Sequence, residues 1–407
     1  MNRRVVVTGM AGISPLGNDW PTIRKRLGAY RNAIVRMEEW AGYEGLNTQL
    51  GAPAAPFELS TRYDRKATRS MGRVALLATR ASELALHDAG LLDHPLLKSG
   101  QMGVSFGSSA GTPSAIGDFG RMMEERTTRG INATTYIKMM AHTAPVNIGV
   151  FFGVTGRVIT TSSACTSGSQ GIGYAYEAIK SGRQLAMIAG GAEELDATEA
   201  AVFDTLFATS TRNDAPQTSP RPFDRARDGL VIGEGAGCLI LEERAHALAR
   251  GAAIYAELVG FGTNSDGTHV TQPNAATMKV AMELSLRDAG LSPDAIGYVN
   301  AHGTATAHGD LAESQATHAV FGKRMPISSL KSYMGHTLGA CGALEAWISI
   351  EMMREGWFAP TLNLDDIDPE CGELDYIRGE GRQLDCDYVM SNNFAFGGIN
   401  TSLIFKR

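Results

Sequence analysis

The sequence predicts an α/β protein in which helices cover buried sheets and two similar halves follow one another along the chain. A β-branched run opens the chain at RRVVVTGMAGISPLG, as in a buried strand. Strand-like and helix-like segments then alternate, which is typical of helices packed on sheets. Finally, ELALHDAGL at 83–91 recurs as ELSLRDAGL at 283–291, with seven identities in nine positions at an offset of 200. Internal duplication on this scale favours two stacked halves over a solenoid, which needs more and shorter repeats.

Each copy of the repeat is predicted to be the end of an amphipathic helix, stopped by Gly90 or Gly290 and followed by a short apolar strand. These strands are MGVSFGSS and IGYVNAHGT, and the opening strand has its counterpart in YAELVGFGTNSDG from Tyr255. A third pair, SACTSGSQGIGYAYEAIKSG and MGHTLGACGALEAWISIEMMREG, consists of small-residue turns that lead into helices. We therefore expect one half over 1–250 and the other over 251–407.

The amino-acid composition limits the classes of protein to which this chain can belong. The 407 residues are 43% hydrophobic and 20% charged, as in an ordinary water-soluble globular protein. A formal charge of -6 disfavours a nucleic-acid-binding surface. No apolar stretch reaches the roughly 18 residues of a membrane span, and Thr8 and Ser14 interrupt the short apolar run near the start. The five cysteines form no C-x-x-C pair, which disfavours a disulfide framework or a zinc site and predicts a cytoplasmic protein without a metal.

Cys165 lies in TTSSACTSGSQ, at the turn between a predicted strand, RVITTSS, and a predicted helix. Ile172, Tyr176 and Ile179 recur at helical spacing until Gly182 ends the helix. A helix N-terminus carries about half a positive charge, so we expect it to favour the thiolate and make Cys165 a nucleophile. The alternative is a buried structural cysteine.

Two histidines occupy comparable turns in the second half. His302 follows a predicted strand in YVNAHGTATAHGD, and His336 lies at a glycine-rich turn before a helix in SLKSYMGHTLGACGALEA. They are candidates for bases or hydrogen-bond donors that serve the thiolate. Four other histidines are interpreted as ordinary core or surface residues: His87, His94, His246 and His318.

Five motifs in order give the chain a family resemblance. They are SSACTSG around Cys165, RPFDRARDGLVIGEGAGCLILEE at 221–243, NAHGTAT at 300–306, LKSYMGH at 330–336 and SNNFAFGGINTSL at 391–403. With these motifs the sequence resembles, over nearly its whole length, the β-ketoacyl-[acyl-carrier-protein] synthases, which are condensing enzymes of the thiolase superfamily. The resemblance implies duplicated βαβαβαββ halves in a five-layer αβαβα arrangement.

It also implies an acyltransferase that elongates fatty-acyl, polyketide or polyene chains. Cys165 would hold the acyl chain as a thioester, and His302 and His336 would stabilise the enolate formed when the malonyl group loses carbon dioxide. The backbone N–H groups of Cys165 and Phe396 would form the oxyanion hole. Lys331 and Glu313 are expected to form a buried pair that sets the electrostatics of the site.

The resemblance further implies substrates carried on the phosphopantetheine of acyl carrier protein, with no permanently bound cofactor. Thr304 and Thr306, expected to be exposed, would bind the pantetheine arm, and Thr271 would place the malonyl group. Phe394 and Phe396 would gate the acyl pocket, and Ala110 would line it. A predicted helix in RYDRKATRSMGR would present the carrier-protein docking residues Arg65, Lys66 and Arg69.

Several positions depart from the commoner family pattern. The loop FAFGGIN has Ala395 and Ile399 where glycine and threonine are usual, and Ala307 and Met334 also differ. If the loop needs a glycine to open, Ala395 restricts it. These departures favour a specialised, secondary-metabolite synthase as an alternative to a fatty-acid enzyme.

The exact class of the enzyme and the identity of its partner stay open at this point. A thiolase using coenzyme A would need a second reactive cysteine in the glycine-rich C-terminal loop, and Cys371 and Cys386 lie outside it. A silent chain-length-factor-like subunit would lack the nucleophile. A homodimer formed through the strand near the cysteine is expected, and a heterodimer with a chain-length factor stays open.

Overall fold

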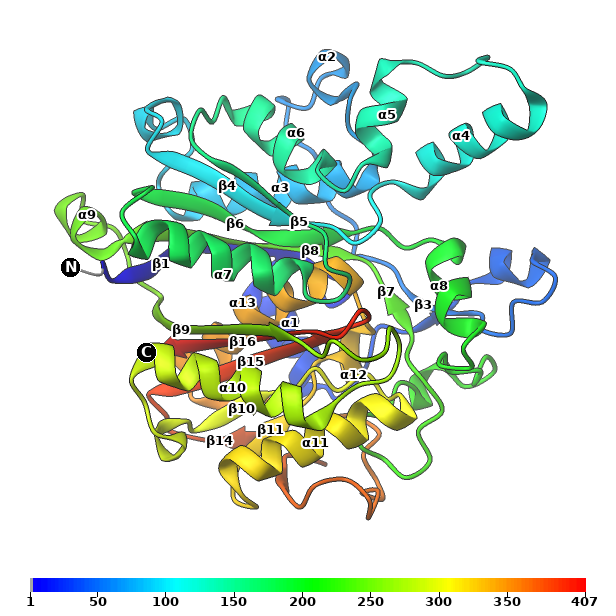
Figure 1. The fold of residues 1–407 in the computed structure, drawn as a ribbon, viewed down its shortest axis with the longest axis vertical. Coiled ribbons are helices and arrows are strands. Elements are labelled where there is room, and N and C mark those ends of the chain that lie inside the picture. The colour runs from blue at the N-terminus through cyan, green and yellow to red at the C-terminus, as the bar shows by residue number, and fades with distance from the viewer. Residues whose placement is uncertain (1–2) are drawn as a thin grey trace.

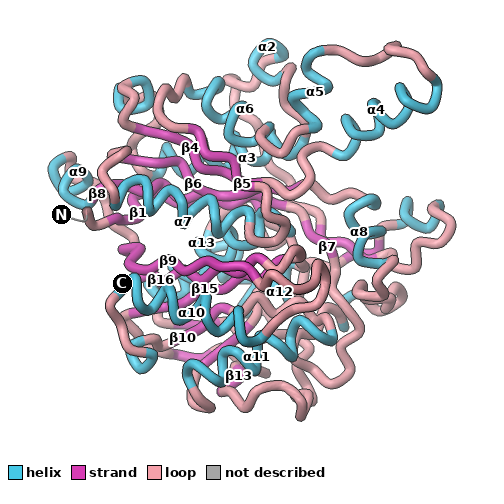
Figure 2. The backbone as a smooth tube through the Cα atoms, viewed as in Figure 1, coloured by secondary structure: helices cyan, strands magenta, loops and turns pink. Residues whose placement is uncertain are grey.

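The chain folds into five alternating layers of helices and strands (Figures 1 and 2). The computed structural model describes residues 3–407. Two helical layers lie on the outside, two layers of strands lie beneath them, and α7 and α13 fill the centre. This arrangement confirms the predicted five-layer α/β fold.

The strands repeat the same order in the two halves. The first half places them in the order β5-β4-β6-β8-β1 and the second in the order β11-β10-β15-β16-β9. The pairing directions also match, because β4 is parallel to both β5 and β6, and β10 is parallel to both β11 and β15. The halves meet where β1 pairs with β9 antiparallel, so the strands form one continuous eleven-stranded sheet. The duplication predicted from the repeated sequence is therefore present in the topology.

The bounds of the main strands are β1 (Val5–Ile13), β4 (Met102–Gly107), β5 (Val158–Thr161), β6 (Ala186–Glu193), β8 (Gly235–Glu243), β9 (Ala256–Ser265), β10 (Tyr298–Asn300), β11 (Pro326–Ser328), β13 (Asp375–Tyr376), β15 (Tyr388–Ala395) and β16 (Ile399–Lys406). Shorter strands are β2 (Val35–Arg36), β3 (Leu50–Ala52), β7 (Ile232–Gly233), β12 (Trp357–Phe358) and β14 (Arg382–Gln383).

The helices of the layers are α3 (Arg73–Asp88) and α6 (Thr143–Phe152) outside the first half, α10 (Ala275–Ala289) and α11 (Ala307–Phe321) outside the second, and α7 (Ser167–Lys180) and α13 (Cys341–Glu355) between them. The other α-helices are α1 (Trp20–Gly28), α2 (Arg65–Thr68), α4 (Pro113–Glu125), α5 (Ala133–Met139), α8 (Ala197–Asp204), α9 (Arg244–Ala249) and α12 (Lys331–Met334).

The central helices are buried because both of their sides face strands. Twelve of the fifteen residues of α13 are buried, and its small and aliphatic side chains pack against β8 and β15. β1 is buried at every position, as its largely apolar sequence predicts for a strand covered on both faces. Burial of this continuous apolar surface is the main favourable term holding the two halves together.

The duplication brings the chemistry to one place. Cys165 follows β5, and His336 follows β11, the strand that takes the same position in the second half. His302 follows β10, and Phe396 lies in the turn between β15 and β16. The predicted positions are confirmed for Cys165 at a strand-to-helix turn, for His302 at a strand end and for His336 at a glycine-rich turn before a helix, and the three turns converge.

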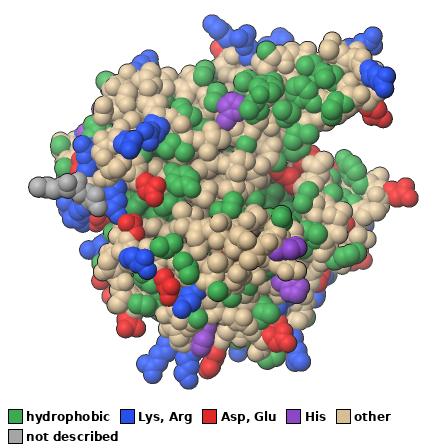
Figure 3. All heavy atoms as spheres, viewed as in Figure 1, with side chains coloured by type: hydrophobic (Ala, Val, Ile, Leu, Met, Phe, Trp, Pro, Cys, Tyr) green, Lys and Arg blue, Asp and Glu red, His purple; other side chains and the backbone are tan. Residues whose placement is uncertain are grey.

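Two peripheral features matter later. The arm formed by α4 and α5 stands away from the layers (Figure 1), and hydrophobic side chains gather over it (Figure 3), among them the exposed Ile116, Met123 and Tyr136. The helix predicted in RYDRKATRSMGR is only the single turn α2, which Asp64 caps, so Arg69 lies just beyond it. Within residues 3–407 we find no helix that combines the length and the apolar character needed to cross a membrane.

Candidate active site

Small polar residues build the turn that carries Cys165. The Thr166 hydroxyl donates to the carbonyl oxygen of Ser163 at 2.8 Å, and the Ser167 hydroxyl donates to that of Ala164 at 2.7 Å. Ala164 has a left-handed backbone, with φ of 49°, directly before the cysteine. The turn is therefore sharp, and its own hydroxyl side chains donate to carbonyl oxygens that no helix or sheet hydrogen bond satisfies.

Glycines let three segments approach one another behind this turn. A Cβ on Gly191, in β6, would lie 2.1 Å from the carbonyl oxygen of Gly339, and one on Gly168, in α7, would lie 2.8 Å from the same oxygen. No larger residue fits at Gly191 without moving backbone. The small residues near Cys165 thus allow the loop that carries His336 to pack closely, and they also leave the sulfur accessible.

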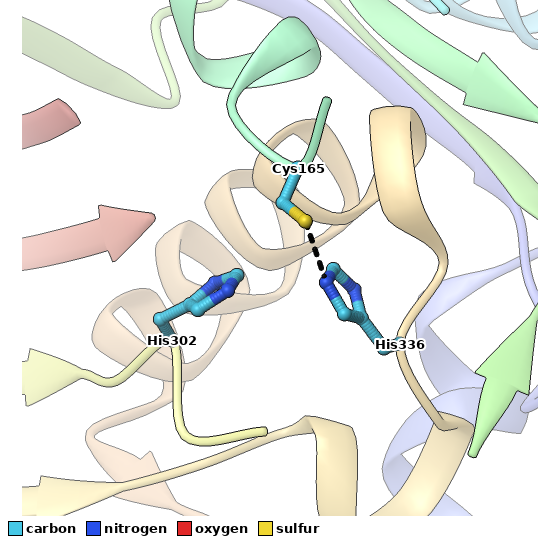
Figure 4. Close-up of side chains that lie close together, drawn as sticks. All are labelled: Cys165, His302 and His336. Atoms are coloured by element: carbon cyan, nitrogen blue, oxygen red, sulfur yellow. Dashed lines mark hydrogen bonds between the residues drawn. The ribbon is translucent and has the colours of Figure 1, made fainter. Parts of the chain in front are cut away.

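His336 contacts the sulfur directly. Its Nε2 lies 2.9 Å from Sγ of Cys165 (Figure 4), and its Nδ1 accepts the backbone N–H of Leu338 at 3.2 Å. Because Nδ1 accepts a hydrogen bond, the ring proton is on Nε2, so His336 presents a donor toward the sulfur. Burial and the charge of Lys331 lower the pKa of His336 well below its usual value, which keeps the ring neutral.

His302 completes a three-residue cluster. Its ring lies 5.1 Å from that of His336, nearly perpendicular to it, and one ligand-type atom from each of Cys165, His302 and His336 lies within 4.8 Å of the others. Such atoms are also of the kinds that bind zinc, so the expected absence of a metal stays a prediction. Burial, Lys331 and His336 lower the pKa of His302 well below its usual value.

A buried relay orients His302. Lys331 forms an ion pair with Glu345, whose other oxygen accepts the Asn393 amide at 2.7 Å. The same amide nitrogen lies 3.4 Å from Nδ1 of His302. Since the amide donates to Nδ1, the proton of His302 is also on Nε2. Both imidazoles are therefore neutral donors.

The expected pair of Lys331 with Glu313 is wrong. Lys331 pairs with Glu345, whereas Glu313 accepts the backbone N–H groups of His302 and Gly303, each at 2.7 Å. Glu313 thus holds the turn that carries His302, and burial raises its pKa to about 8. Lys331 pairs with Glu345 and not with Glu313 because Glu345 lies on the central helix α13, which faces Lys331, whereas Glu313 lies on α11, directly behind the turn of His302.

The expectation of a thiol acidified by a helix N-terminus is also wrong for the free protein. Burial raises the pKa of Cys165 to about 12, although the charge of Lys331 and the backbone N–H groups of Phe396 and Cys165 act in the opposite direction. The thiol is only 4% exposed, and loss of water disfavours its anion more than these groups stabilise it. These two backbone N–H groups are the ones predicted to form the oxyanion hole, and that role stays a prediction.

A cavity of about 580 Å³ leads to Cys165 and to both histidines. All three predicted threonines line it: Thr271, Thr304 and Thr306. The expectation that Thr304 is exposed is wrong, because it is buried and its hydroxyl lies 2.9 Å from that of Thr306. Phe394 and Phe396 also line the cavity, and the Phe396 ring packs against Phe203 with centroids 4.9 Å apart.

The remaining predicted residues lie apart from this cavity. Ala110 is not among the described residues that line it, and its backbone nitrogen lies 3.4 Å from a carboxylate oxygen of Glu193. Arg65, Lys66 and Arg69 are exposed around α2 and are not brought to the cavity lining. Ala395 has no positive φ, so this conformation of the loop does not itself need a glycine there, whereas Gly397 and Gly398 have φ of 85° and 68°.

Sequence reasoning missed several buried polar residues. Glu345 and Asn393 form the relay to His302, and the Cys341 thiol donates to the carbonyl oxygen of Cys165 at 3.2 Å. A single acid inside the apolar helix sequence GALEAWISI was an available signal for Glu345, because a buried charge needs a partner. Nothing local in the sequence distinguishes Asn393 from its neighbour Asn392.

Comparisons with known proteins agree with this site. The family model "Beta-ketoacyl synthase, N-terminal domain" matches residues 2–247, and "Beta-ketoacyl synthase, C-terminal domain" matches residues 255–365. The 3-oxoacyl-[acyl-carrier-protein] synthase 2 of Vibrio harveyi is 38% identical over 413 residues, covering 100% of this chain and 99% of that protein.

Solved structures are similar as well. A beta-ketoacyl synthase from Burkholderia phymatum STM815 is 60% identical, with a TM-score of 0.98, and the match covers 100% of this chain and 99% of that one. The ishigamide ketosynthase/chain length factor is 29% identical, with a TM-score of 0.89 over 100% of this chain and 99% of that one. Fold and relatives define a condensing acyltransferase. The chain belongs to the β-ketoacyl synthase family.

Proposed function

We propose that this protein is a 3-oxoacyl-[acyl-carrier-protein] synthase that extends an acyl chain by decarboxylative condensation with a malonyl group. The observation that carries the proposal is the contact of 2.9 Å between Sγ of Cys165 and Nε2 of His336, with His302 beside them at the end of one cavity. A cavity of this size is ordinary for a small-molecule site and suits a pantetheine arm. The name of the Vibrio relative supports acyl carrier protein as the carrier.

Acylation comes first in this scheme. The Cys165 sulfur attacks the thioester carbonyl of the acyl carrier protein, the bond to the carrier sulfur breaks, and the proton of the Cys165 thiol ends on the released carrier thiol. Because burial raises the pKa of Cys165, the thiol is protonated before the substrate arrives and loses its proton during the attack. The N–H groups of Phe396 and Cys165 stabilise the tetrahedral oxyanion.

Condensation follows. The malonyl carboxylate leaves as carbon dioxide, and its electron pair forms an enolate whose oxygen accepts the Nε2–H groups of His302 and His336. Neutral donors suit this step better than imidazolium ions, since the donor keeps its proton throughout. The enolate carbon then attacks the thioester on Cys165, the Cys165 sulfur leaves, and one proton from water restores the thiol.

The supporting residues keep their proposed roles. Thr304, Thr306 and Thr271 bind the pantetheine arm and malonyl group, and their positions in the cavity lining support this. Phe394 and Phe396 gate the acyl pocket. Ala110 lies outside the cavity described above, so its place in the lining of the acyl pocket stays a prediction. Arg65, Lys66 and Arg69 dock the acidic carrier protein, and their exposure supports this role.

A dimer is part of the proposal. β5 lies at the end of the eleven-stranded sheet, and an open strand edge is a ready surface for pairing with a second chain. The exposed apolar side chains of the α4–α5 arm lie in the same half. The likeness to a ketosynthase/chain length factor keeps a heterodimer as an alternative, in which this chain is the active member. The division at residue 250 and a cytoplasmic location stay predictions.

The experiment is a complete condensation with doubly carbon-13-labelled malonyl carrier protein and a panel of acyl carrier proteins. We expect a β-ketoacyl product two carbons longer than the primer and one carbon dioxide for each product. Primer consumption with no new carbon–carbon bond, under conditions in which Cys165 is acylated, would contradict the proposal. The preferred primer separates a fatty-acid enzyme from a specialised synthase.

A further inference from the structure

Glu199, on α8, is a buried acid that the chain leaves without a partner. Glu199 is 6% exposed, and neither of its carboxyl oxygens has a hydrogen-bond partner among the described residues. Its neighbour Glu193 is the opposite case, because it accepts the Ser108 hydroxyl at 2.8 Å and the backbone nitrogens of Ser109 and Gly339 at 2.6 and 3.1 Å. Buried polar atoms are normally satisfied, so an orphan carboxyl indicates a missing partner.

The charges around Glu199 favour a hydrogen-bond donor as that partner. The groups that act on it are the carboxyls of Glu193, Glu194, Asp196 and Glu234, which together with burial raise its pKa well above the usual value. The Arg73 guanidinium is engaged by Glu234 at 2.6 Å. A hydroxyl or an amine brings positive density to such a place, whereas an anion is repelled. The raised pKa keeps the carboxyl protonated, so it offers one acceptor oxygen and one O–H donor.

The position of Glu199 relates it to the acyl chain. It lies one turn before Phe203 on the same helix, and residues four apart share a helix face. Phe203 lines the cavity together with Cys165, and the side chains of Ala197, Ala200 and Phe203 pack in one apolar cluster with Cys165. Four residues along an α-helix span roughly 6 Å. Glu199 itself lies outside the described lining of the cavity, so a chain on Cys165 reaches it only by running along α8 past Phe203.

We propose that Glu199 binds a hydrogen-bond donor, a hydroxyl or an amine, carried on the far part of the acyl chain attached to Cys165. The inference rests on the proposed function and makes it more specific. It predicts that the enzyme accepts chains with a remote donor in preference to plain chains of the same length. A plain chain leaves the carboxyl oxygens unsatisfied, and an unsatisfied buried polar group lowers affinity.

The test measures the rate of Cys165 acylation by intact mass, using carrier proteins that bear plain, ω-hydroxy and ω-amino acyl chains in a series of matched lengths. For the wild type we expect the donor-bearing chains to react faster at one or more lengths. Glu199→Leu should shift the ratio of donor-bearing to plain chains by about 5- to 150-fold toward plain chains. Glu199→Gln keeps an acceptor oxygen but cannot ionise, so it should retain preference for the hydroxyl and lose more of that for the amine.

Glu194→Gln is the matched control. Glu194 is also a buried acid next to Glu193, but its carboxylate accepts the backbone N–H of Val74 at 3.2 Å, on the side of α3. We expect the control to change the ratio far less than Glu199→Leu does, because Glu194 contributes only a neighbouring charge. If Glu199→Leu does not fold, the comparison of hydroxyl and amine in Glu199→Gln still tests the inference.

Three results would overturn it. The first is a wild type with no preference for a donor at any length, and the second is a ratio that Glu199→Leu leaves unchanged. The third is weaker self-association of the Glu199 variants with unchanged selectivity, which would make Glu199 a contact of a second chain. Failure of every chain to load Cys165 would instead refute the proposed function, so the two failures are distinguishable.

Discussion

The buried ion pair of Lys331 and Glu345 offers the most demanding stability prediction. Both residues are fully buried, and the Asn393 amide donates a further hydrogen bond to Glu345 at 2.7 Å. Lys331→Met leaves the Glu345 charge without its cation, which typically costs about 3–5 kcal/mol of unfolding free energy. The double variant Lys331→Met/Glu345→Gln removes the charge as well and keeps an acceptor for Asn393, so we expect it to recover most of that loss.

Guanidinium unfolding of the wild type, both single variants and the double variant gives the coupling energy of the pair. A second measurement separates stability from electrostatics. Lys331 lowers the pKa of Cys165, so its removal should slow alkylation of Cys165 by iodoacetamide in the single and the double variant alike. A double variant no more stable than Lys331→Met, or alkylation that becomes faster without Lys331, would refute the reasoning.

Three further predictions concern the turns around the site. Burial raises the pKa of Glu313 from an ordinary value near 4.5 to about 8, so the folded protein binds this proton more tightly than the unfolded chain and should lose stability as pH rises between these values. In unfolding measurements at pH 5–8, the stability of Glu313→Gln should depend less steeply on pH than that of the wild type, and equal slopes would contradict this. Gly191→Ala should lower the free energy of unfolding by about 1–3 kcal/mol because the new Cβ meets the Gly339 carbonyl oxygen, while Gly117→Ala, in open space on α4, should be neutral or stabilising. Equal melting temperatures of the two variants would show that Gly191 and Gly339 are packed less tightly. His302→Ala should abolish malonyl decarboxylation, followed as carbon dioxide release, while sparing acylation, and unimpaired release would remove His302 from its proposed role.

The fold could be predicted from sequence because its signals are local and repeated. The echo at 83–91 and 283–291 falls at the ends of α3 and α10, and the strands after them take equivalent places in the two half-sheets. Cys165 and His336 likewise follow equivalent strands, so the duplicated pattern placed both at one site. The five motifs gave the same result through resemblance.

The partners of buried charges could not be predicted in the same way. Lys331 lies fourteen positions before Glu345 and eighteen after Glu313, and spacing does not say which acid faces it across the layers. The prediction of a lowered pKa for Cys165 was wrong for a related reason. The helix N-terminus is visible in the sequence, whereas the burial of the thiol depends on how the whole turn packs. Helix length around Arg65 was overestimated because basic residues at helical spacing continue past the point where α2 ends.

The acylation state of Cys165 tests the central claim most directly. Protein mixed with acyl carrier protein and freed of excess reagent should gain the mass of one acyl group, and Cys165→Ala should gain none. An adduct of the same mass on Cys165→Ala would contradict the account, because the sulfur held between the two imidazoles would then not be the group that carries the chain.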